Sequence, residues 1–416
     1  MEILALHDLI QYRYPGMIGS KVKRNAFSPR YSNFYRHDAH AVSSVQLTNG
    51  NSWTFFGLFD GYNGWHTSDF LSSFLIPEVL NDLVRLCSKY EPPSAEHTEL
   101  GTLAQSEVDL EPLPQAMIKI IKNTFQGLDG TIVNDGVERV LSSPSKSAAR
   151  IPLSVAQSGS SALLAFFDSD SRLLRIALTG NSRAVLGRRL VEKRKGECFY
   201  DVHVLTTDQD AHNPTEEARL TALHPNENVI EKGHVLGCRA SRAFGLAMYK
   251  WSREIQDRLH NEYLGDRPPE NLKTPPYITA EPEITTITVK SGDFLVMASS
   301  GLWNCLTNEE VVGLVGLWLN REMNAVDQQD PVTWDKHLDD DDAQVVRRDE
   351  LPASMKEDNT VMYRRWRAQK RFLCVDDNAA GHLARNALGG ADRDLTAALL
   401  SMTPPRSLRY RCISSP

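Results

Sequence analysis

Strand-like runs joined by short turns are the feature that most restricts how this chain can fold. Val42–Leu47 and Trp53–Phe59 are rich in β-branched and aromatic residues, and the short segment between them contains the turn residues Thr48, Asn49, Gly50 and Asn51. Such a turn joins antiparallel neighbours, because Asn and Gly adopt the backbone conformations that a hairpin needs. The sequence therefore predicts antiparallel sheets. Further runs of this kind lie at Ala162–Phe167, Leu173–Leu178, Ala184–Leu186, Val202–Leu205, Ile284–Val289 and Asp293–Ala298.

Helical patterns lie between these strand-like blocks. Apolar residues recur at helical spacing over residues 70–83, where Pro77 is expected to bend or split the helix, and again over residues 117–125. Antiparallel strand blocks separated by helical pairs predict an α+β layered fold rather than a doubly wound parallel sheet. Three more helices are expected at Thr307–Asn320, where Thr307 and Glu310 match a capping box, at Asn378–Leu388 and at Asp392–Met402.

The composition excludes several classes of protein. With 416 residues, 41% hydrophobic and 24% charged, the chain is long and apolar enough to bury a large core. Its net charge of −7 predicts no nucleic-acid partner, because such proteins concentrate basic residues on one face. No apolar stretch reaches the ~18–20 residues that span a bilayer, so no transmembrane segment is expected. Six cysteines without CxxC spacing indicate reduced thiols, and together these features predict a soluble intracellular protein.

The domain organisation follows from shifts in composition. We expect an irregular N-terminal segment over residues 1–32 and a single domain over residues 33–416. Two polar stretches, near 91–114 and 321–358, indicate surface insertions within that domain. The second insertion contains Asp339–Asp342, which indicates a solvated loop rather than a metal site, because a run of like charges repels itself.

An acidic residue followed by glycine ends the second strand-like run, in the segment LFDGYNGW that contains Asp60 and Gly61. Hard divalent ions prefer oxygen ligands of this kind. Taken with later segments, this one resembles the type 2C protein phosphatases of the metal-dependent PPM family, and most of all their mitochondrial pyruvate dehydrogenase phosphatase branch. The later segments are GSSALLAFF (Gly159–Phe167), LTGNSRAVL (Leu178–Leu186), CRASRAFG (Cys238–Gly245), DFLVMASSGLWN (Asp293–Asn304) and DNAAGHLARNALGG (Asp377–Gly390).

The resemblance implies two stacked antiparallel β-sheets flanked by helix pairs, with a metal site at one edge of the sandwich. It implies hydrolysis of phosphoserine and phosphothreonine esters by a water molecule shared between two Mg²⁺ or Mn²⁺ ions. It also implies a phosphoprotein partner, such as a pyruvate dehydrogenase-type complex, and a mitochondrial location. The family pattern ends with an acid and a closing strand, whereas this chain reads RYRCISSP over Arg409–Pro416, so the last strand is expected to be missing.

The resemblance also assigns the site residues. Asp60 and the Gly61 carbonyl match metal ligands, and Asp38 matches one of a pair of family acids. Tyr62 stands at the position of the family's histidine general acid, and its ordinary pKa near 10 makes it a weak proton donor at neutral pH. Residues that are not acids replace family acids at His37, Asn181, Ser300, Asn304 and Cys412, and Leu246 stands where the family favours aspartate.

So few carboxylates cannot hold two divalent ions well, and Mg²⁺ or Mn²⁺ binding is expected to be weak or lost. We therefore expect a PPM-type homologue with impaired catalysis, a pseudophosphatase with a phosphoprotein-binding or regulatory role. The alternative is an active Mg²⁺/Mn²⁺-dependent phosphatase that uses Asp38, Asp60 and Gly61 with substitute ligands. A third possibility is a decayed gene without a stable product.

Two further groups of residues have alternative interpretations. A rebuilt site would bind one transition metal through mixed nitrogen and oxygen ligands, whereas ordinary strand and helix positions would explain the same histidines. Arg183 and Arg242 are expected to form structural pairs rather than to contact phosphate. The candidate ligands of the rebuilt site are His37, Asp38, His40, Asp60 and His66.

Overall fold

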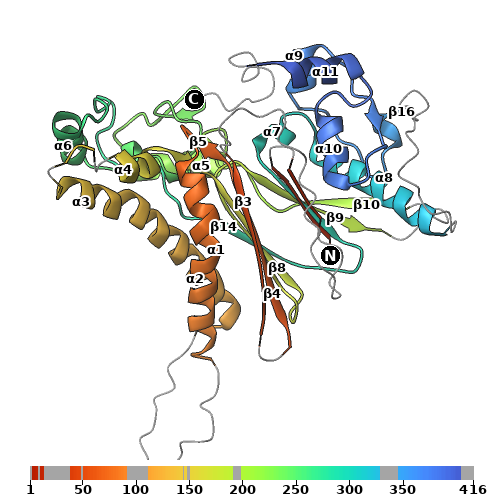
Figure 1. Cartoon of the computed structure of the whole chain (residues 1–416), viewed down its shortest axis with the longest axis horizontal. Coiled ribbons are helices and arrows are strands. Elements are labelled where there is room, and N and C mark those ends of the chain that lie inside the picture. The colour runs from red at the N-terminus through yellow and green to blue at the C-terminus, as the bar shows by residue number, and fades with distance from the viewer. Residues whose placement is uncertain are drawn as a thin grey trace, which may run out of the picture.

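The computed structural model describes residues 2–7, 10–13, 38–47, 50–90, 111–143, 145–147, 150–190, 198–327 and 345–403. Within these residues, two five-stranded sheets stack on each other and helices cover their outer faces (Figure 1). The predicted α+β sandwich of two stacked sheets flanked by helix pairs is thereby confirmed.

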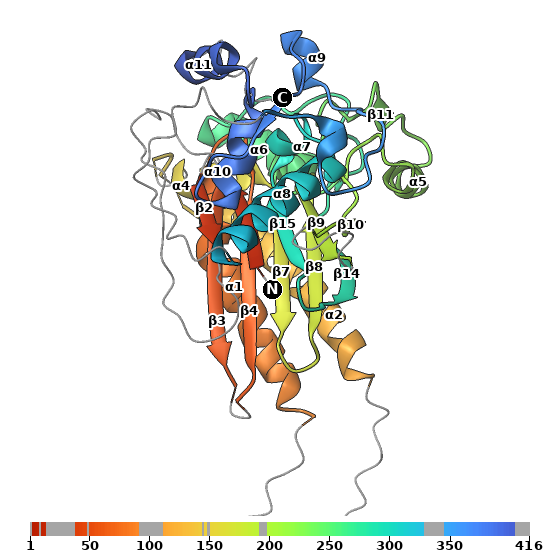
Figure 2. The ribbon, with the colours of Figure 1, turned by 90° about the vertical axis from the view of Figure 1, so that its right-hand side faces the viewer.

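The first sheet is antiparallel throughout, and its long strands run side by side in Figure 2. The predicted hairpin forms its edge, where Val45 pairs with Trp53 and Ala39 pairs with Phe59. The order across the sheet is β14 (Glu283–Thr288), β8 (Leu173–Thr179), β7 (Ala162–Asp168), β4 (Ser52–Phe59) and β3 (Ala39–Gln46).

The second sheet contains strands that the sequence did not predict. Residues 1–32 were expected to be irregular, but two strands form there, and the first pairs in parallel with β15, Glu2 opposite Phe294. Because β15 pairs with β9 on its other side, it has a neighbour on both edges. The strand expected to be missing after Arg409 lies outside the described residues. The order is β10 (Tyr200–Val204), β9 (Arg183–Arg189), β15 (Phe294–Ala298), β1 (Glu2–His7) and β2 (Ile10–Arg13).

Three apolar clusters account for the layers. One lies between the sheets and includes Leu58 and Leu295, both completely buried. A second packs helices α1 (His66–Cys87) and α2 (Leu113–Gly130) on the first sheet. A third packs α8 (Asn308–Asp327) and α10 (Ala379–Ala387) on the second sheet. Burial of these faces, and not helix propensity alone, holds the four helices in place.

One helix is not split as one alternative for Pro77 had it, and another is longer than predicted. Pro77 does not split α1. A proline has no N–H, so the Ser73 carbonyl has no hydrogen-bond donor within the helix. Pro77 and Ser73 both lie on the exposed side of α1, where water can donate a hydrogen bond to that carbonyl. Helix α8 does not end near Asn320 but continues to Asp327. Asn320 is buried, and its amide exchanges hydrogen bonds with the Cys198 backbone at 3.1 and 2.9 Å. The predicted Thr307–Glu310 capping box does form.

Residues 205–282, between β10 and β14, leave the sandwich and return to it, and we call them the excursion. The excursion has small cores of its own, one around Leu220 and Tyr277 and another around Leu246 and Ile278. It contains α5 (Pro214–Leu223), β11 (Ile230–Glu231), β12 (His234–Val235), β13 (Phe244–Gly245), η3 (Ala247–Tyr249) and α6 (Arg253–Tyr263).

Short elements complete the described chain. They include β16, which lies within the predicted 321–358 insertion and pairs with β17. Of the predicted 91–114 insertion, residues 91–110 lie outside the described residues. The short elements are β5 (Gly61–Tyr62), η2 (Thr131–Asp135), α3 (Gly136–Leu141), α4 (Arg150–Gln157), β6 (Gly159–Ser160), α7 (Ser300–Trp303), β16 (Val345–Val346), η5 (Arg348–Glu350), α9 (Met362–Trp366), β17 (Phe372–Leu373) and α11 (Arg393–Ser401).

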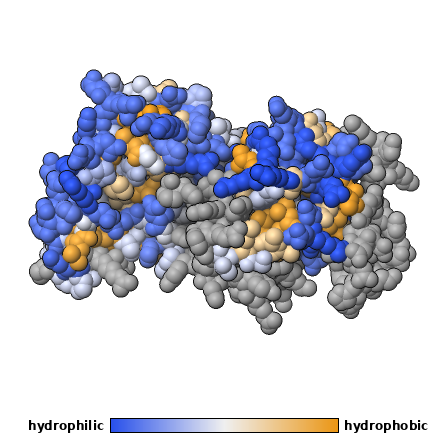
Figure 3. All heavy atoms as spheres, turned by 90° about the horizontal axis from the view of Figure 1, so that it is seen from above, coloured by the Kyte–Doolittle hydropathy of each residue, from blue (hydrophilic) through white to orange (hydrophobic). Residues whose placement is uncertain are grey.

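The surface seen from above is largely hydrophilic, with separate apolar patches between the charged regions (Figure 3). Among the described helices, none is both long enough and apolar enough to cross a membrane.

Candidate functional site

Asp60 lies at the end of β4, where the chain passes directly into the short strand β5. The residue is buried, with 7% of its surface exposed, and its backbone oxygen accepts a hydrogen bond from the Ser161 N–H at 2.9 Å. Asp38 immediately precedes β3, whose first residue pairs with the last residue of β4. The antiparallel register therefore brings Asp38 and Asp60 to neighbouring strand ends.

Other family positions reach the same end of the sandwich. Asn181 lies in the turn between β8 and β9, and the pairing of Ala162 with Thr179 places that turn beside the end of β7. Ser300 follows β15, whose Ala298 pairs with Arg183 on β9. Ser300, the first residue of α7, therefore follows the strand end that lies beside the start of β9. The strand ends of both sheets thus gather at one edge of the sandwich.

Tyr62 and Asn181, two positions where the family pattern is broken, contact each other directly. The Tyr62 hydroxyl donates a hydrogen bond to the Asn181 Oδ1 atom at 2.7 Å. Beside them, the Ser161 and Ser182 hydroxyls share a hydrogen bond at 2.8 Å. These contacts join neutral groups, whereas a two-metal site would need carboxylates there.

The surroundings of Tyr62 make it a poorer acid than free tyrosine. Burial raises its pKa well above 10, and the negative charge of Asp60 raises it further. Both causes act on the phenolate, the form left after proton donation, so proton transfer from Tyr62 to a leaving group is disfavoured.

Ser300 is the first residue of the short helix α7, and Asn304 is the residue directly after it. The Asn304 backbone oxygen accepts hydrogen bonds from the Val361 and Met362 N–H groups, each at 3.1 Å, so this residue joins α7 to the start of α9. Its side-chain Nδ2 atom is buried and has no hydrogen-bond partner among the described residues. Asn304 therefore supports the local backbone without supplying an acid.

Leu246 follows β13 in the left-handed backbone region, with φ of 47°. Leucine seldom adopts this conformation, whereas aspartate and asparagine do so more readily. The side chain is 2% exposed and packs on Gly159, where an added Cβ atom would lie 2.5 Å from Leu246 Cγ. An apolar contact thus occupies the position where the family favours an acid.

The donor set does not fit the metals that the resemblance implied. Among the described residues, no group of three or more His, Cys, Asp or Glu side chains is placed to hold a metal ion. The same finding opposes the rebuilt transition-metal site, and His66 stacks on Trp65 with ring centroids 4.3 Å apart. His37 and Cys412 lie outside the described residues.

The two arginines of the retained motifs form structural pairs. Arg183 bonds Asp208 at 2.8 Å and the Asn308 side chain at 2.9 Å. Arg242 bonds Glu216 at 2.6 Å inside the excursion. Both contacts agree with the expectation from the sequence.

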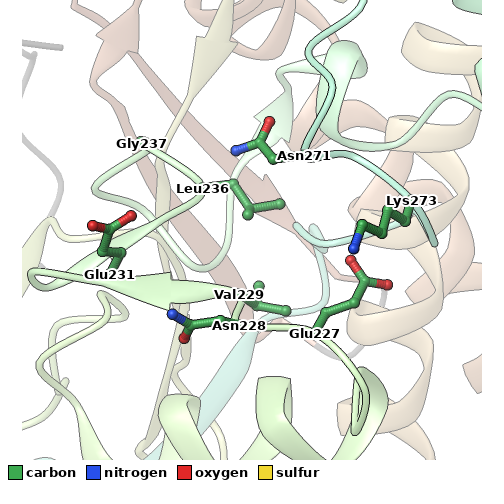
Figure 4. A pocket seen from close by; sticks show the side chains of 8 residues that line it. All are labelled: Glu227, Asn228, Val229, Glu231, Leu236, Gly237, Asn271 and Lys273. Carbon is green, nitrogen blue, oxygen red and sulfur yellow. The ribbon is translucent and has the colours of Figure 1, made fainter.

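A cavity of about 460 Å³ in the excursion was not foreseen, and none of the predicted site residues lines it. In Figure 4 the Lys273 amine and the Glu227 carboxylate point toward one another. The Glu227 carboxylate also accepts a hydrogen bond from the Tyr277 hydroxyl at 2.6 Å. The lining residues belong to β11 and to the segments around β11 and β12 and before Tyr277, and they carry no motif: Glu227, Asn228, Val229, Glu231, Leu236, Gly237, Asn271 and Lys273.

Comparison with known proteins agrees with the fold and with the retained motifs. The family model for protein phosphatase 2C matches residues 96–331. A protein phosphatase 2C homologue from Schizosaccharomyces pombe is 37% identical, over 93% of this chain and 78% of its own length.

Two mitochondrial phosphatases named for pyruvate dehydrogenase are also similar. Phosphatase 1 of Saccharomyces cerevisiae is 34% identical over 86% of this chain, and human phosphatase 1 is 30% identical over 76% of it. This chain spans 60% of the yeast protein and 56% of the human one. The family match and the Schizosaccharomyces pombe relative together show that this chain belongs to the protein phosphatase 2C family.

Proposed function

We propose that this chain is a catalytically impaired member of the protein phosphatase 2C family, which acts by binding a phosphoprotein or a regulatory partner rather than by hydrolysis. The observation that carries this proposal is the hydrogen bond between Tyr62 and Asn181. Each residue replaces a group that the family chemistry uses, a proton donor at one position and an acid at the other. The Tyr62 proton is engaged by the Asn181 side chain, and neither residue offers a carboxylate to a metal ion.

The remaining donors support the same conclusion. A two-metal mechanism needs several carboxylates, because the paired ions must activate water and neutralise the phosphate. Ser300 and Asn304 supply none at their positions. If each lost ligand weakens metal binding by roughly 10–100-fold, as loss of an outer-shell partner does, several losses together remove binding at ordinary metal concentrations.

Turnover of a phosphothreonine peptide with Mn²⁺ tests the proposal. The native chain is expected to show no more turnover than an Asp60→Ala variant. Asp170→Ala, in the exposed turn at the far end of the β7–β8 hairpin, is the matched control for general effects of removing an aspartate. Mn²⁺-dependent turnover that survives in Asp170→Ala and disappears in Asp60→Ala would refute the impairment.

The second candidate function is an active Mg²⁺/Mn²⁺-dependent phosphatase. It is favoured by one observation, that Asp38 and Asp60 lie at neighbouring strand ends, where both carboxylates would face one ion. In that case Asp38, Asp60 and the Gly61 carbonyl would hold the ion, and Mn²⁺ titration of the native chain would give a signal that Asp38→Ala loses.

For either function we propose a phosphorylated subunit of a pyruvate dehydrogenase-type complex as partner, and a mitochondrial location. The support is the similarity to the yeast and human phosphatases. Affinity capture with the phosphorylated and the unphosphorylated forms of the complex is the test. We expect retention of the phosphorylated form, and equal retention of both would contradict the proposal. Fractionation of cells that express the tagged full-length protein tests the location.

A further inference from the structure

Three departures from the family pattern, at Tyr62, Asn181 and Leu246, belong to one connected set of contacts. Tyr62 donates its hydrogen bond to Asn181 on one side. On the other side, it packs against the apolar cluster of the excursion that contains Leu246 and Ile278. Asn181 and the cluster that contains Leu246, 65 positions apart in the sequence, are thereby joined through Tyr62.

The turn that contains Asn181 is bonded to the excursion by two hydrogen bonds between Gly180 and Gln209. The Gly180 N–H donates to the Gln209 Oε1 atom at 2.8 Å, and the Gln209 N–H donates to the Gly180 oxygen at 3.0 Å. Gln209 is completely buried and belongs to the excursion. Gly180 has φ of +110°, and an added Cβ atom would lie 3.4 Å from the Tyr62 hydroxyl, so the turn approaches the tyrosine closely.

Backbone pairing completes the connection. The short strand β6 pairs with β5 through Tyr62 and Gly159, and with β13 of the excursion through Gly159 and Gly245. Gly159 is also the residue on which Leu246 packs. The site end and the excursion are therefore joined by backbone pairing, by the Gly180–Gln209 hydrogen bonds and by an apolar contact. The neutral Tyr62–Asn181 hydrogen bond connects the two places at the site end where the excursion is attached.

We propose that Tyr62, Asn181 and Leu246 form a neutral latch, which fastens the excursion to the site end of the sandwich without a divalent metal. Clustered carboxylates repel one another and need cations to stay together, whereas neutral groups in a buried hydrogen bond carry no such cost. The three substitutions then act as one unit, because each contributes a surface that another one contacts. The latch is a proposal about what stabilises the contact between the excursion and the site end, and it does not depend on whether the chain hydrolyses phosphate esters.

A double-mutant cycle read by amide hydrogen exchange tests the latch. Tyr62→Phe and Asn181→Ala each remove the same hydrogen bond, worth about 1 kcal/mol, so each is expected to speed exchange about fivefold in peptides that cover residues 178–184. The double variant is expected to resemble the single ones, because the bond can be lost only once. Multiplied effects, about twenty-five-fold in the double variant, would overturn the coupling.

Tyr249→Phe is the matched control. Tyr249 packs against the same cluster as Tyr62, but its hydroxyl makes no hydrogen bond to a described residue. It is expected to leave exchange of residues 178–184 unchanged, and an effect equal to that of Tyr62→Phe would show general loosening instead of a latch.

The metal independence has its own measurement, which uses only the native chain. Exchange in these peptides is expected to be as slow in EDTA as in Mn²⁺; the melting temperature is not used, because any Mn²⁺ that binds the folded chain would raise it. Loss of protection in EDTA, restored by Mn²⁺, would overturn the proposal even if the variants failed to fold. Phosphatase turnover is not part of this readout, so a failed latch and a failed functional proposal remain distinguishable.

Discussion

The site end of the sandwich and the buried ion pairs elsewhere in the molecule differ in the side chains that they bury: neutral partners at the site end, and carboxylates paired with Arg or Lys elsewhere. At the site end, Tyr62 and Asn181 join through a neutral hydrogen bond. In the excursion, Glu216 is 1% exposed and bonds Arg242, Arg219 and the Ser241 hydroxyl. In the first turn of α8, Glu310 is completely buried and bonds Arg348 at 2.6 Å and Lys370 at 2.7 Å. Glu216 and Glu310 are thus buried with cations that the chain itself supplies, whereas Asp60 is a buried acid that remains at the site end.

The difference follows from the cost of burying charge. An unpaired buried carboxylate is strongly destabilising, whereas one bonded to arginine or lysine is neutralised in place. In a two-metal site the cations come from solution, so its acids are costly to the folded chain when no metal binds. Neutral residues at positions 181, 300 and 304 remove that cost, whereas the paired acids of the scaffold never incur it.

Breaking the Glu216 network is expected to have the largest effect. Glu216→Gln leaves Arg242, which is 8% exposed, without its buried counter-charge, and we expect a loss of about 3–5 kcal/mol in the free energy of unfolding. Urea denaturation measures it. The control is Glu262→Gln, which removes an acid from an exposed helical pair with Arg258 and should cost less than 1 kcal/mol. Equal losses in the two variants would contradict the comparison.

The same carboxylate predicts an acid-sensitive step. Burial alone would raise the pKa of Glu216, but hydrogen bonds from Arg242, Arg219 and Ser241 outweigh it and lower the pKa to about 2. A depressed folded-state pKa gives stability that is present above the unfolded value of about 4.5 and is lost as pH falls toward 2. In Glu216→Gln the loss of unfolding free energy between pH 4.5 and pH 2 that this carboxylate causes should be absent.

His382 of α10 shows a third way of burying an ionisable group, and its effect is expected to be somewhat smaller. Burial lowers its pKa to about 4, although the charge of Asp376 acts in the opposite direction. Below pH 6.5 the unfolded chain takes up a proton that the folded chain refuses, so stability falls between pH 6.5 and 4 by about 3 kcal/mol. In His382→Gln this loss should be absent. Urea denaturation across this pH range measures it, and identical pH profiles for the native chain and the variant would refute the assignment.

Much of the fold could be read from local sequence. Hairpin turns and strand-like runs predicted the first sheet, because antiparallel neighbours lie close in the chain. The caps at Asn378 and Asp392 mark the starts of α10 and α11, where each side chain accepts a backbone hydrogen bond as such residues do. The parallel pairing of β1 with β15 could not be foreseen, since no local pattern connects strands that begin 292 residues apart.

The candidate site was only partly accessible to sequence reasoning. Comparison with the family pattern singled out Tyr62 and Asn181 separately, because each is a departure at a position of known type. It could not show that they bond to each other, since 119 residues separate them and only the meeting of β5 with the β8–β9 turn brings them together. The close packing of Leu246 on Gly159 could not be predicted either, because these two residues are also far apart in the sequence.

The smallest expected effect concerns an ion pair that bridges α2 and the start of β14 at the surface. The Lys122 amine lies 2.9 Å from the Glu281 carboxylate, with 37% and 39% of the two side chains exposed. Water screens this pair, and holding two long side chains in one geometry costs entropy, so Lys122→Met should change the free energy of unfolding by less than about 1 kcal/mol. The change should shrink further in high salt, whereas the Glu216→Gln loss should persist because its partners are buried. A salt-independent loss as large as that of Glu216→Gln would mean that geometry, rather than burial, decides which ion pairs stabilise this fold.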